Sequence, residues 1–382
     1  MNVIRKSRNR IRNELEALPA LRKFGTGWIS GVAGLSLGIV ALGLVIAARF
    51  PGVFSMPELG AFRTAVWFRL LEMTVLLFAF TSSVLSLLLR DSRSLGTAGV
   101  CLTMLAAALG GTGATPLLKD YTPLYLGLDY FVINVLFTGI LFIPLESFFP
   151  KHSEQPLFRA EWREDLLYYL VSSMLVQILS WLSLGPSRVM VSHTSWADLR
   201  DRVAGLPLWV QVIAIMFLTD FTQYWIHRAF HRIPFLWGLH AVHHSARAMD
   251  WMAGARMHFL EIITLRGATV IPMMLLGFHS NAVGVYIFLV YLWSTFIHAN
   301  IGWRFGWLER WLVTPRFHHW HHGVEDESID VNFAIHFPIL DKLFGTFHLP
   351  EERWPNGYGV GGHPVPKGYI QQFLYPFKNP KE

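Results

Sequence analysis

The sequence is poor in cysteine and in charge. Its 382 residues include a single cysteine, Cys101, which lies within an apolar stretch. An intrachain disulfide is therefore impossible, and a zinc-finger type of thiolate site is excluded because it needs several cysteines. Charged residues make up only 15% of the chain and hydrophobic residues 53%. This composition is too apolar for an ordinary soluble protein and predicts an integral membrane protein.

The positive charge of the chain does not indicate a nucleic-acid partner. The formal net charge is +6, but the basic residues lie mainly at the ends of apolar stretches, as at Arg5, Lys6, Arg8, Arg10 and Arg12. Such placement is typical of cytoplasmic loops and of contacts with anionic lipid headgroups. The sequence shows no basic stripe interleaved with aromatic residues, so we expect no nucleic acid among the partners.

Long apolar stretches predict the membrane spans. We place them at 28–48, 70–89, 95–118, 124–145, 166–184, 206–226, 262–278 and 282–297. The last two are separated by three residues and form either a spanning hairpin or a re-entrant one. The mixed stretch 187–203 is expected to form an amphipathic helix on the membrane surface.

Glycines recur every four residues in the first of these stretches. Gly27 and Gly31, and then Gly34 and Gly38, have the spacing that lets two helices approach closely. A dimer interface could use the same spacing. We expect packing against helices of the same chain.

Histidine is the residue type that indicates a metal site in this chain. Ten of the seventeen histidines form a pattern suited to a pair of metal ions: His227, His231, His240, His243, His244, His258, His298, His318, His321 and His322. Residues three or four positions apart share one face of a helix, so each cluster can direct several imidazoles at one point. Imidazole binds iron, zinc, copper or nickel and does not select among them by affinity alone.

Residues around these clusters offer further candidates. Four polar side chains could orient the imidazoles by accepting their second N–H: Asp220, Glu261, Asp330 and Asn332. For His298 the alternative is a helix-end histidine bonded to a carbonyl, and His258 could equally contact substrate or a ligand. His319 is one residue off the spacing and is not expected to be a ligand.

A polar, charged stretch at 150–165 breaks the apolar pattern and predicts a domain boundary. We expect an N-terminal transmembrane region at 1–150 of unassigned role, a catalytic domain at 151–350 and a polar tail at 351–382. With the N-terminus inside, most Lys and Arg fall on the cytoplasmic side, as do all the histidine clusters. The fold class is therefore an all-α polytopic membrane bundle with a cytoplasmic helical cap that holds a histidine-rich di-metal site.

The chain resembles a known family between about Asp165 and Pro350. The boxes H-x-x-x-H, H-x-x-H-H and a second H-x-x-H-H are similar, in this order, to those of the fatty acid hydroxylase/sterol desaturase superfamily of integral-membrane di-iron oxygenases. Flanking segments also resemble that superfamily: DFTQYWIHRAFH from Asp220, LWGLHAVHHS from Leu236, RMHFLE from Arg256, TPRFHHWHH from Thr314 and DKLFGTF from Asp341. Phe259 departs from a usual proline, and Ile339-Leu340 from a usual tryptophan. The first 150 residues are not covered by the resemblance.

The resemblance implies a mechanism and partners. Two irons held by neutral imidazoles would use O2 and external electrons to hydroxylate or desaturate a lipid, a fatty acyl chain or a sterol-like ring, that enters from the bilayer. No cytochrome-like or flavin-binding segment is recognised, so a separate electron-donor protein is expected. A further branch of the superfamily cleaves ether lipids, and no motif decides between these reactions.

Two interpretations from other classes remain. The first is a membrane metal transporter or metal-binding protein without catalytic activity. It would carry its ligands at mid-membrane depth along a path, whereas these histidines follow the ends of the spans. The second is bis-histidine anchoring of a haem, which a visible spectrum would reveal. The sequence decides neither the substrate nor the oligomeric state.

Overall fold

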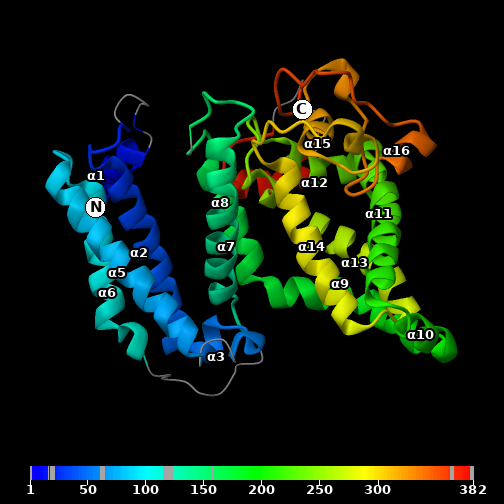
Figure 1. Cartoon of the computed structure of the whole chain (residues 1–382), viewed down its shortest axis with the longest axis horizontal. Coiled ribbons are helices and arrows are strands. Elements are labelled where there is room, and N and C mark those ends of the chain that lie inside the picture. The colour runs from blue at the N-terminus through cyan, green and yellow to red at the C-terminus, as the bar shows by residue number, and fades with distance from the viewer. Residues whose placement is uncertain are drawn as a thin grey trace. The chain divides into compact units, whose positions relative to one another are not determined.

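The computed structural model of the chain describes residues 2–15, 17, 22–60, 65–114, 124–156, 158–361 and 365–378. Across these residues the structure is helical, with two isolated β-bridges and no longer strand (Figure 1). The prediction of an all-α fold is confirmed. The chain divides into two compact units, Met1–Leu136 with Ser173–Gln177, and Phe137–Ser172 with Ile178–Glu382. The predicted domain limits at 150 and 350 are not tested by this division and stay predictions.

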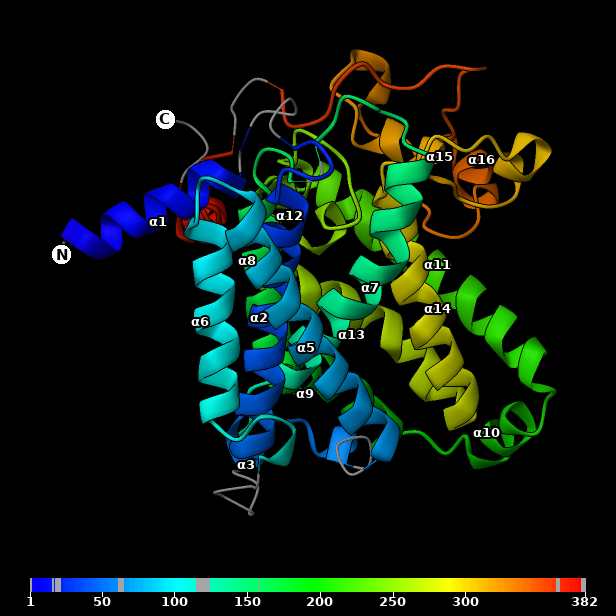
Figure 2. The ribbon, with the colours of Figure 1, turned by 60° about the vertical axis from the view of Figure 1, so that its left-hand side comes forward.

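The first unit is built from long apolar helices that pack closely. It contains α1 (Asn2–Leu15), α2 (Trp28–Arg49), α3 (Pro51–Phe54), η2 (Pro57–Leu59), α5 (Val66–Leu89), α6 (Ser94–Ala108) and η3 (Gly111–Gly113). Figure 2 shows α2, α5 and α6 running alongside one another. A Cβ on Gly34 would lie 2.9 Å from the Cα of Ser83, and one on Gly31 would lie 3.0 Å from the Cβ of Leu95. The glycines therefore admit neighbouring helices of the same chain, which confirms the expected packing.

The second unit carries all the histidine clusters. Its helices are α8 (Trp162–Met174), α9 (Val176–Ser192), α10 (Ala197–Ala204), α11 (Leu208–Arg232), α12 (Pro234–His244), α13 (Phe259–Leu276), α14 (Ser280–His298), α15 (Pro315–His321), α16 (Ile339–Phe344) and α17 (Tyr369–Leu374), with short 3-10 turns η4 (Ala253–Ala255), η5 (Gly306–Arg310), η6 (Asp326–Ser328) and η7 (Tyr375–Phe377). The helix α7 (Leu128–Phe148) begins in the first unit and ends in the second, and the junction of α8 and α9 at Ser173–Gln177 belongs to the first.

Six helices are long and apolar enough to cross a membrane, or up to eight if each of two bent helix pairs is one span. The bent pairs are α8 with α9, at 65°, and α10 with α11, at 118°. These spans lie at the eight predicted places, so the predicted membrane bundle is confirmed. The predicted surface helix at 187–203 is divided instead between the end of α9 and the short α10. The predicted span 95–118 ends in residues that lie outside the described part of the chain.

A tight hairpin joins the last two spans. Gly277 ends α13 in a left-handed conformation with φ 69°, which glycine adopts without a steric penalty. His279 then begins α14, and its Nδ1 accepts a hydrogen bond from Asn281 N at 3.2 Å. The two helices therefore return the chain to the end of the unit at which α13 began.

Helices α12, α15 and α16 form a cap at one end of α11 and α14 (Figure 1). A buried apolar cluster fastens the cap to these helices. It includes Tyr224 of α11, Ile297 of α14, Phe317 of α15, Phe333 and Leu340. Burial of aromatic and aliphatic side chains is the main stabilising contribution in such a cluster. The cap therefore holds α12 and α15 over the ends of the spans.

Candidate metal centre

Nine of the ten candidate histidines converge in the cap and form two groups. The first group consists of His227, His231, His240, His244 and His321, and the second of His243, His298, His318 and His322. In each group, one ring nitrogen per residue lies within 4.8 Å of all the others. All nine side chains are buried or nearly so. Segments far apart in the sequence thus supply two sets of nitrogen donors.

Helix geometry explains how two helices serve both groups. On α12, His240 and His244 are four residues apart and share one face, whereas His243 points to the second group. The segment that includes α15 does the same, because His318 and His322 serve the second group and His321 the first. The groups are adjacent, with the rings of His244 and His322 centred 4.4 Å apart. This arrangement suits two metal ions placed next to each other.

The hydrogen bonds of the rings decide which nitrogen faces inward. The Nδ1 atoms of five ligand candidates donate to an oxygen, so their Nε2 atoms carry a lone pair and no proton. The pairs are His227 with Phe333 O at 2.8 Å, His240 with Glu261 Oε1 at 2.6 Å, His243 with Arg256 O at 3.1 Å, His298 with Ser294 O at 2.6 Å and His321 with Val331 O at 2.8 Å.

The inward-facing nitrogen atoms lie close together although no proton is available to form a hydrogen bond between them. The Nε2 atoms of His227 and His240 are 3.0 Å apart, and those of His243 and His298 are 3.2 Å apart. In both pairs the protons are on the Nδ1 atoms, so two lone pairs face each other. Lone pairs at this distance repel unless a cation lies among them. The donor set therefore fits metal ions in both groups.

Burial keeps the rings in the neutral form that a metal needs. Burial, and then the neighbouring histidines, lower the pKa of the cap residues His240, His244 and His321 well below the ordinary value of 6.5. The same holds for His243, His318 and His322. Neutral imidazole is the metal-binding form, so these residues are ready to coordinate at neutral pH.

A strained loop between α15 and α16 supplies two of the orienting carbonyls. Asp330 and Asn332 have φ values of 60° and 59°, in the left-handed region that these residue types tolerate. They alternate with Val331 and Phe333, whose carbonyl oxygens accept from His321 and His227. The two left-handed residues thus direct the carbonyl groups of Val331 and Phe333 toward the first group.

The four predicted orienting side chains divide into two kinds. Glu261 accepts from His240, and Asp330 Oδ1 lies 3.4 Å from His231 Nδ1. Asn332 bonds to the backbone of Phe317 and His348 and to none of the imidazoles that the structure describes. Asp220 accepts instead from three backbone amides, those of residues 335–337, at 2.8, 3.1 and 2.7 Å. Asp220 and Asn332 therefore hold the cap loop and do not touch the rings.

His258 lies outside both groups. Its Nδ1 accepts from Leu260 N at 3.2 Å and so caps α13, and its Nε2 lies 3.0 Å from Phe373 O. Both ring nitrogens are thus occupied by local contacts, and the ring and Phe259 each stack on Phe373. His319, which was not expected to be a ligand, also lies outside the groups, and its Nδ1 lies 2.9 Å from Tyr358 Oη.

A buried network of charges was not found from the sequence. Asp165 accepts from Arg159 at 2.5 Å and from Arg256 at 2.6 Å, and Arg159 also pairs with Asp250. All four side chains are buried, and burial raises the pKa of Asp250. The backbone oxygen of Arg256 orients His243, so the network supports the second group. Asp341 was missed similarly, and it accepts from the amides of Phe333 and Ala334.

Comparisons with known proteins agree with this geometry. Residues 212–346, which include every histidine of both groups, match the fatty acid hydroxylase family. The chain is 32% identical over 179 residues to the ornithine lipid hydroxylase OlsE of Rhizobium tropici, covering 45% of this chain and 51% of that protein. It is 32% identical over 146 residues to human alkylglycerol monooxygenase, covering 38% and 32% of the two chains.

A methylsterol monooxygenase of Arabidopsis thaliana is 28% identical over 242 residues, which cover 57% of this chain and 78% of that protein. The chain thus spans about half the length of the ornithine lipid hydroxylase it matches. No solved structure matches it significantly. The segment that matches the fatty acid hydroxylase family thus contains both histidine groups and the candidate spans α13 and α14.

Proposed function

We propose that this protein is a membrane oxygenase that uses O2 and external electrons to hydroxylate or desaturate a lipid. The observation that carries the proposal is the pair of adjacent groups of buried imidazoles whose lone pairs converge. Related proteins named as a lipid hydroxylase and as monooxygenases support the same reaction class. Their names also support a lipid as the substrate.

Iron is the metal that we propose for both groups. The donors are all imidazoles, which bind iron well, and the described residues place no thiolate among them. Iron held by these residues would supply the reduction of O2 and the removal of hydrogen from an unactivated C–H bond, which no side chain achieves alone. The five histidines of the first group and the four of the second are the proposed ligands.

Residues around the histidines fix the orientation of the rings and shield them from water. The carbonyls of Phe333, Val331 and Arg256 fix the ring orientations, and Glu261 does so as a buried carboxylate. Phe230 and Phe333 are fully buried, and their rings pack against those of His240 and His227, respectively. Exclusion of water strengthens the electrostatic interactions in such a site and limits side reactions.

The overall reaction must balance oxygen and electrons. In hydroxylation, one oxygen atom of O2 enters the C–H bond and the other leaves as water, with two electrons and two protons taken up. In desaturation, both oxygen atoms leave as water and the lipid loses two hydrogens. Both outcomes need an external electron donor, which we propose is a separate protein. We propose that the metal centre faces the cytoplasm, as the distribution of basic residues favours.

Ether-lipid cleavage is a second candidate reaction. It is favoured by the similarity to human alkylglycerol monooxygenase over 146 residues. In that reaction, hydroxylation of the carbon next to the ether oxygen would give a hemiacetal, whose C–O bond to the ether oxygen would then break to release an aldehyde and an alcohol. A metal transporter is disfavoured because the ligands lie at the ends of α11 and α14 and in the cap, and do not line a path through the spans.

Lipid analysis of cells with and without the protein tests the proposal. Cells with the wild-type chain should gain lipids that carry one more oxygen or lack two hydrogens, and a fatty aldehyde would indicate ether cleavage. Cells with His243→Ala should match cells without the protein. An identical lipid profile in all three strains, with the proteins present in the membrane, would refute the enzymatic proposal.

A further inference from the structure

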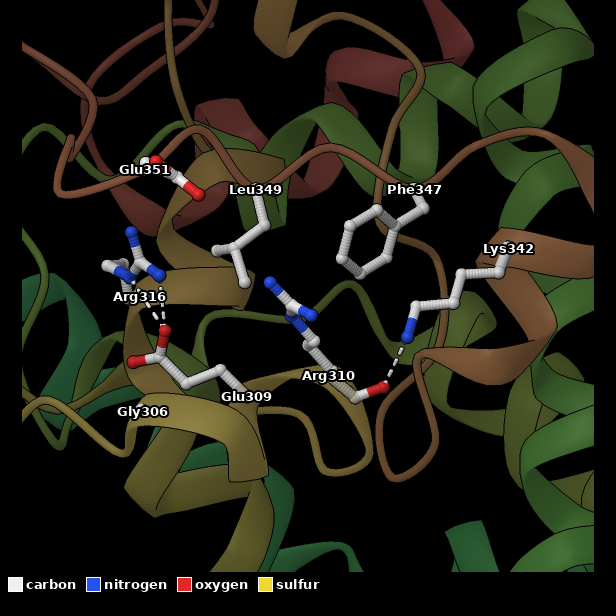
Figure 3. A pocket seen from close by; sticks show the side chains of 8 residues that line it. All are labelled: Gly306, Glu309, Arg310, Arg316, Lys342, Phe347, Leu349 and Glu351. Carbon is white, nitrogen blue, oxygen red and sulfur yellow. Dashed lines mark hydrogen bonds and ion pairs between the residues drawn. The ribbon is translucent and has the colours of Figure 1, made fainter.

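A polar pocket of about 440 Å³ lies beside the metal-binding helix α15 (Figure 3). It is lined by Gly306, Glu309, Arg310, Arg316, Lys342, Phe347, Leu349 and Glu351. Neither the family resemblance nor the metal centre accounts for this pocket. Its charged side chains fall into two sets, one that is bonded within the protein and one that is not.

The first set is an ion pair whose two charges cancel. Glu309 is buried and forms a two-nitrogen ion pair with Arg316, and its second oxygen accepts from Phe305 N at 3.2 Å. Arg316 also donates to Pro350 O at 2.8 Å. This pair therefore forms one wall of the pocket and adds little net charge.

The second set is open to a ligand. Among the described residues, the guanidinium of Arg310 and the carboxylate of Glu351 have no hydrogen bond or ion pair, and both residues are exposed. Figure 3 shows the Arg310 guanidinium reaching into the pocket, with Glu351 and Lys342 at opposite edges. Lys342 donates one N–H to Arg310 O at 2.6 Å and retains two others. The pocket thus has a cationic end and an anionic end.

The pocket lies where a membrane lipid can reach it. The segment that lines it follows the candidate span α14 directly and carries Trp307 and Trp311, which are 70% and 58% exposed. Exposed tryptophans next to a span are typical of the membrane–water interface. Lys342 also packs on the ring of Trp311 at 5.6 Å. Lys342, at the cationic end of the pocket, therefore contacts a side chain typical of the membrane–water interface.

We infer that this pocket binds the headgroup of a zwitterionic membrane lipid. Its anionic oxygen group, a phosphate or a carboxylate, would bind Arg310 and Lys342, and its ammonium group would bind Glu351. A guanidinium matches such oxygens with two parallel hydrogen bonds, and an ammonium adds a point charge. The inference rests on the proposed function and deepens it by naming the headgroup class of the lipid.

Lipid retention by the full-length protein tests the inference. The protein would be purified in a neutral detergent, mixed with phosphatidylethanolamine and studied by native mass spectrometry without O2. We expect Arg310→Gln and Glu351→Gln each to lower retention about tenfold, the loss expected when a charge-assisted hydrogen bond is removed. The matched controls are Arg304→Gln and Glu352→Gln, because this exposed pair bonds to itself at 3.0 Å outside the pocket.

Three lipids distinguish the chemistry of the headgroup. N-acetylated phosphatidylethanolamine keeps the phosphate and loses the ammonium, so we expect the wild type to retain it poorly. A lipid with a carboxylate and a primary amine separates a carboxylate source from a phosphate source. Soluble glycerophosphoethanolamine, used as a competitor, shows whether the headgroup binds without its chains.

Several outcomes would overturn the inference. One is that the pocket variants and the control variants retain phosphatidylethanolamine equally well. Another is that the wild type retains the N-acetylated lipid as strongly as phosphatidylethanolamine itself. Retention is measured without turnover, so a protein that binds the headgroup but oxidises no lipid would refute only the proposed function. All four exposed variants should keep the wild-type metal content, which reports correct folding.

Discussion

Glu261 Oε1 lies 2.6 Å from His240 Nδ1, and both side chains are buried. The carboxylate holds the proton on Nδ1 and leaves Nε2 free to bind metal. We expect Glu261→Gln to weaken metal binding in the first group about 10- to 100-fold, the usual effect of losing such a partner. Titration of the purified protein with Fe(II) would measure this, and the exposed Glu154→Gln serves as the control. An unchanged affinity for Fe(II) would show that Glu261 does not influence metal binding by His240.

The neighbouring residues 319, 321 and 322 allow a matched test of the two metal groups. His321 belongs to the first group and His322 to the second, whereas His319 is buried but belongs to neither. We expect His321→Ala and His322→Ala each to reduce bound iron and to abolish lipid oxidation. His319→Ala should keep the iron and lose about 1 kcal/mol of stability with its bond to Tyr358. Iron loss from His319→Ala equal to that from His321→Ala would contradict the assignment.

Asp220 accepts from three consecutive backbone amides at residues 335–337. Asp220→Leu leaves these buried donors unpaired, so we expect a loss of about 3 kcal/mol or more of stability. Asp220→Asn keeps one acceptor oxygen and should lose less. Thermal unfolding in detergent would give this order, with Thr222→Val on the same helix as the control. Wild-type stability of Asp220→Leu would refute this role.

Asp165 is the shared acceptor of two buried guanidinium groups, Arg159 and Arg256. Asp165→Asn leaves both cations underpaired, and we expect a loss of about 3–5 kcal/mol of stability. The backbone oxygen of Arg256 orients His243, so metal in the second group should be lost before metal in the first. Iron counts during gradual denaturation would reveal this order. Simultaneous loss from both groups would argue against selective support.

His336 is buried beside Tyr286 and Trp293, and burial lowers its pKa from 6.5 to about 4. Between these pH values the unfolded chain binds the proton and the folded chain does not, so stability falls as the pH decreases from 6.5 to 4. The full loss from this residue is about 3 kcal/mol. We expect His336→Phe to reduce the decline by this amount in denaturation curves at several pH values. An unchanged decline would contradict the shift.

Much of the membrane architecture was predictable because its signals are local. A span is a continuous apolar stretch, and all eight predicted stretches correspond to helices or bent helix pairs. Histidine spacing is equally local, and it anticipated nine residues that the structure brings together. The error at 187–203 arose because α9 extends through Pro186 to Ser192, which composition alone did not indicate.

The inner support of the site was less predictable, because much of it consists of backbone. The carbonyls of Phe333, Val331 and Ser294 accept from ligand rings, yet a carbonyl is present in every residue and leaves no signature in the sequence. Asp220 looked like a partner of histidine because it is an ionisable residue in an apolar stretch. In the structure, the nearer donors are amides of a loop more than one hundred residues away.

The sequence by itself determined that the chain is a helical membrane protein with three histidine boxes, because periodicity and hydropathy act between near neighbours. Only the tertiary structure decided how the boxes divide into two groups, with α12 and α15 each serving both. It also assigned His258 to the start of α13 and brought Arg310 and Glu351 to the lining of one pocket. These features depend on contacts between distant segments, which the packing of the cap creates.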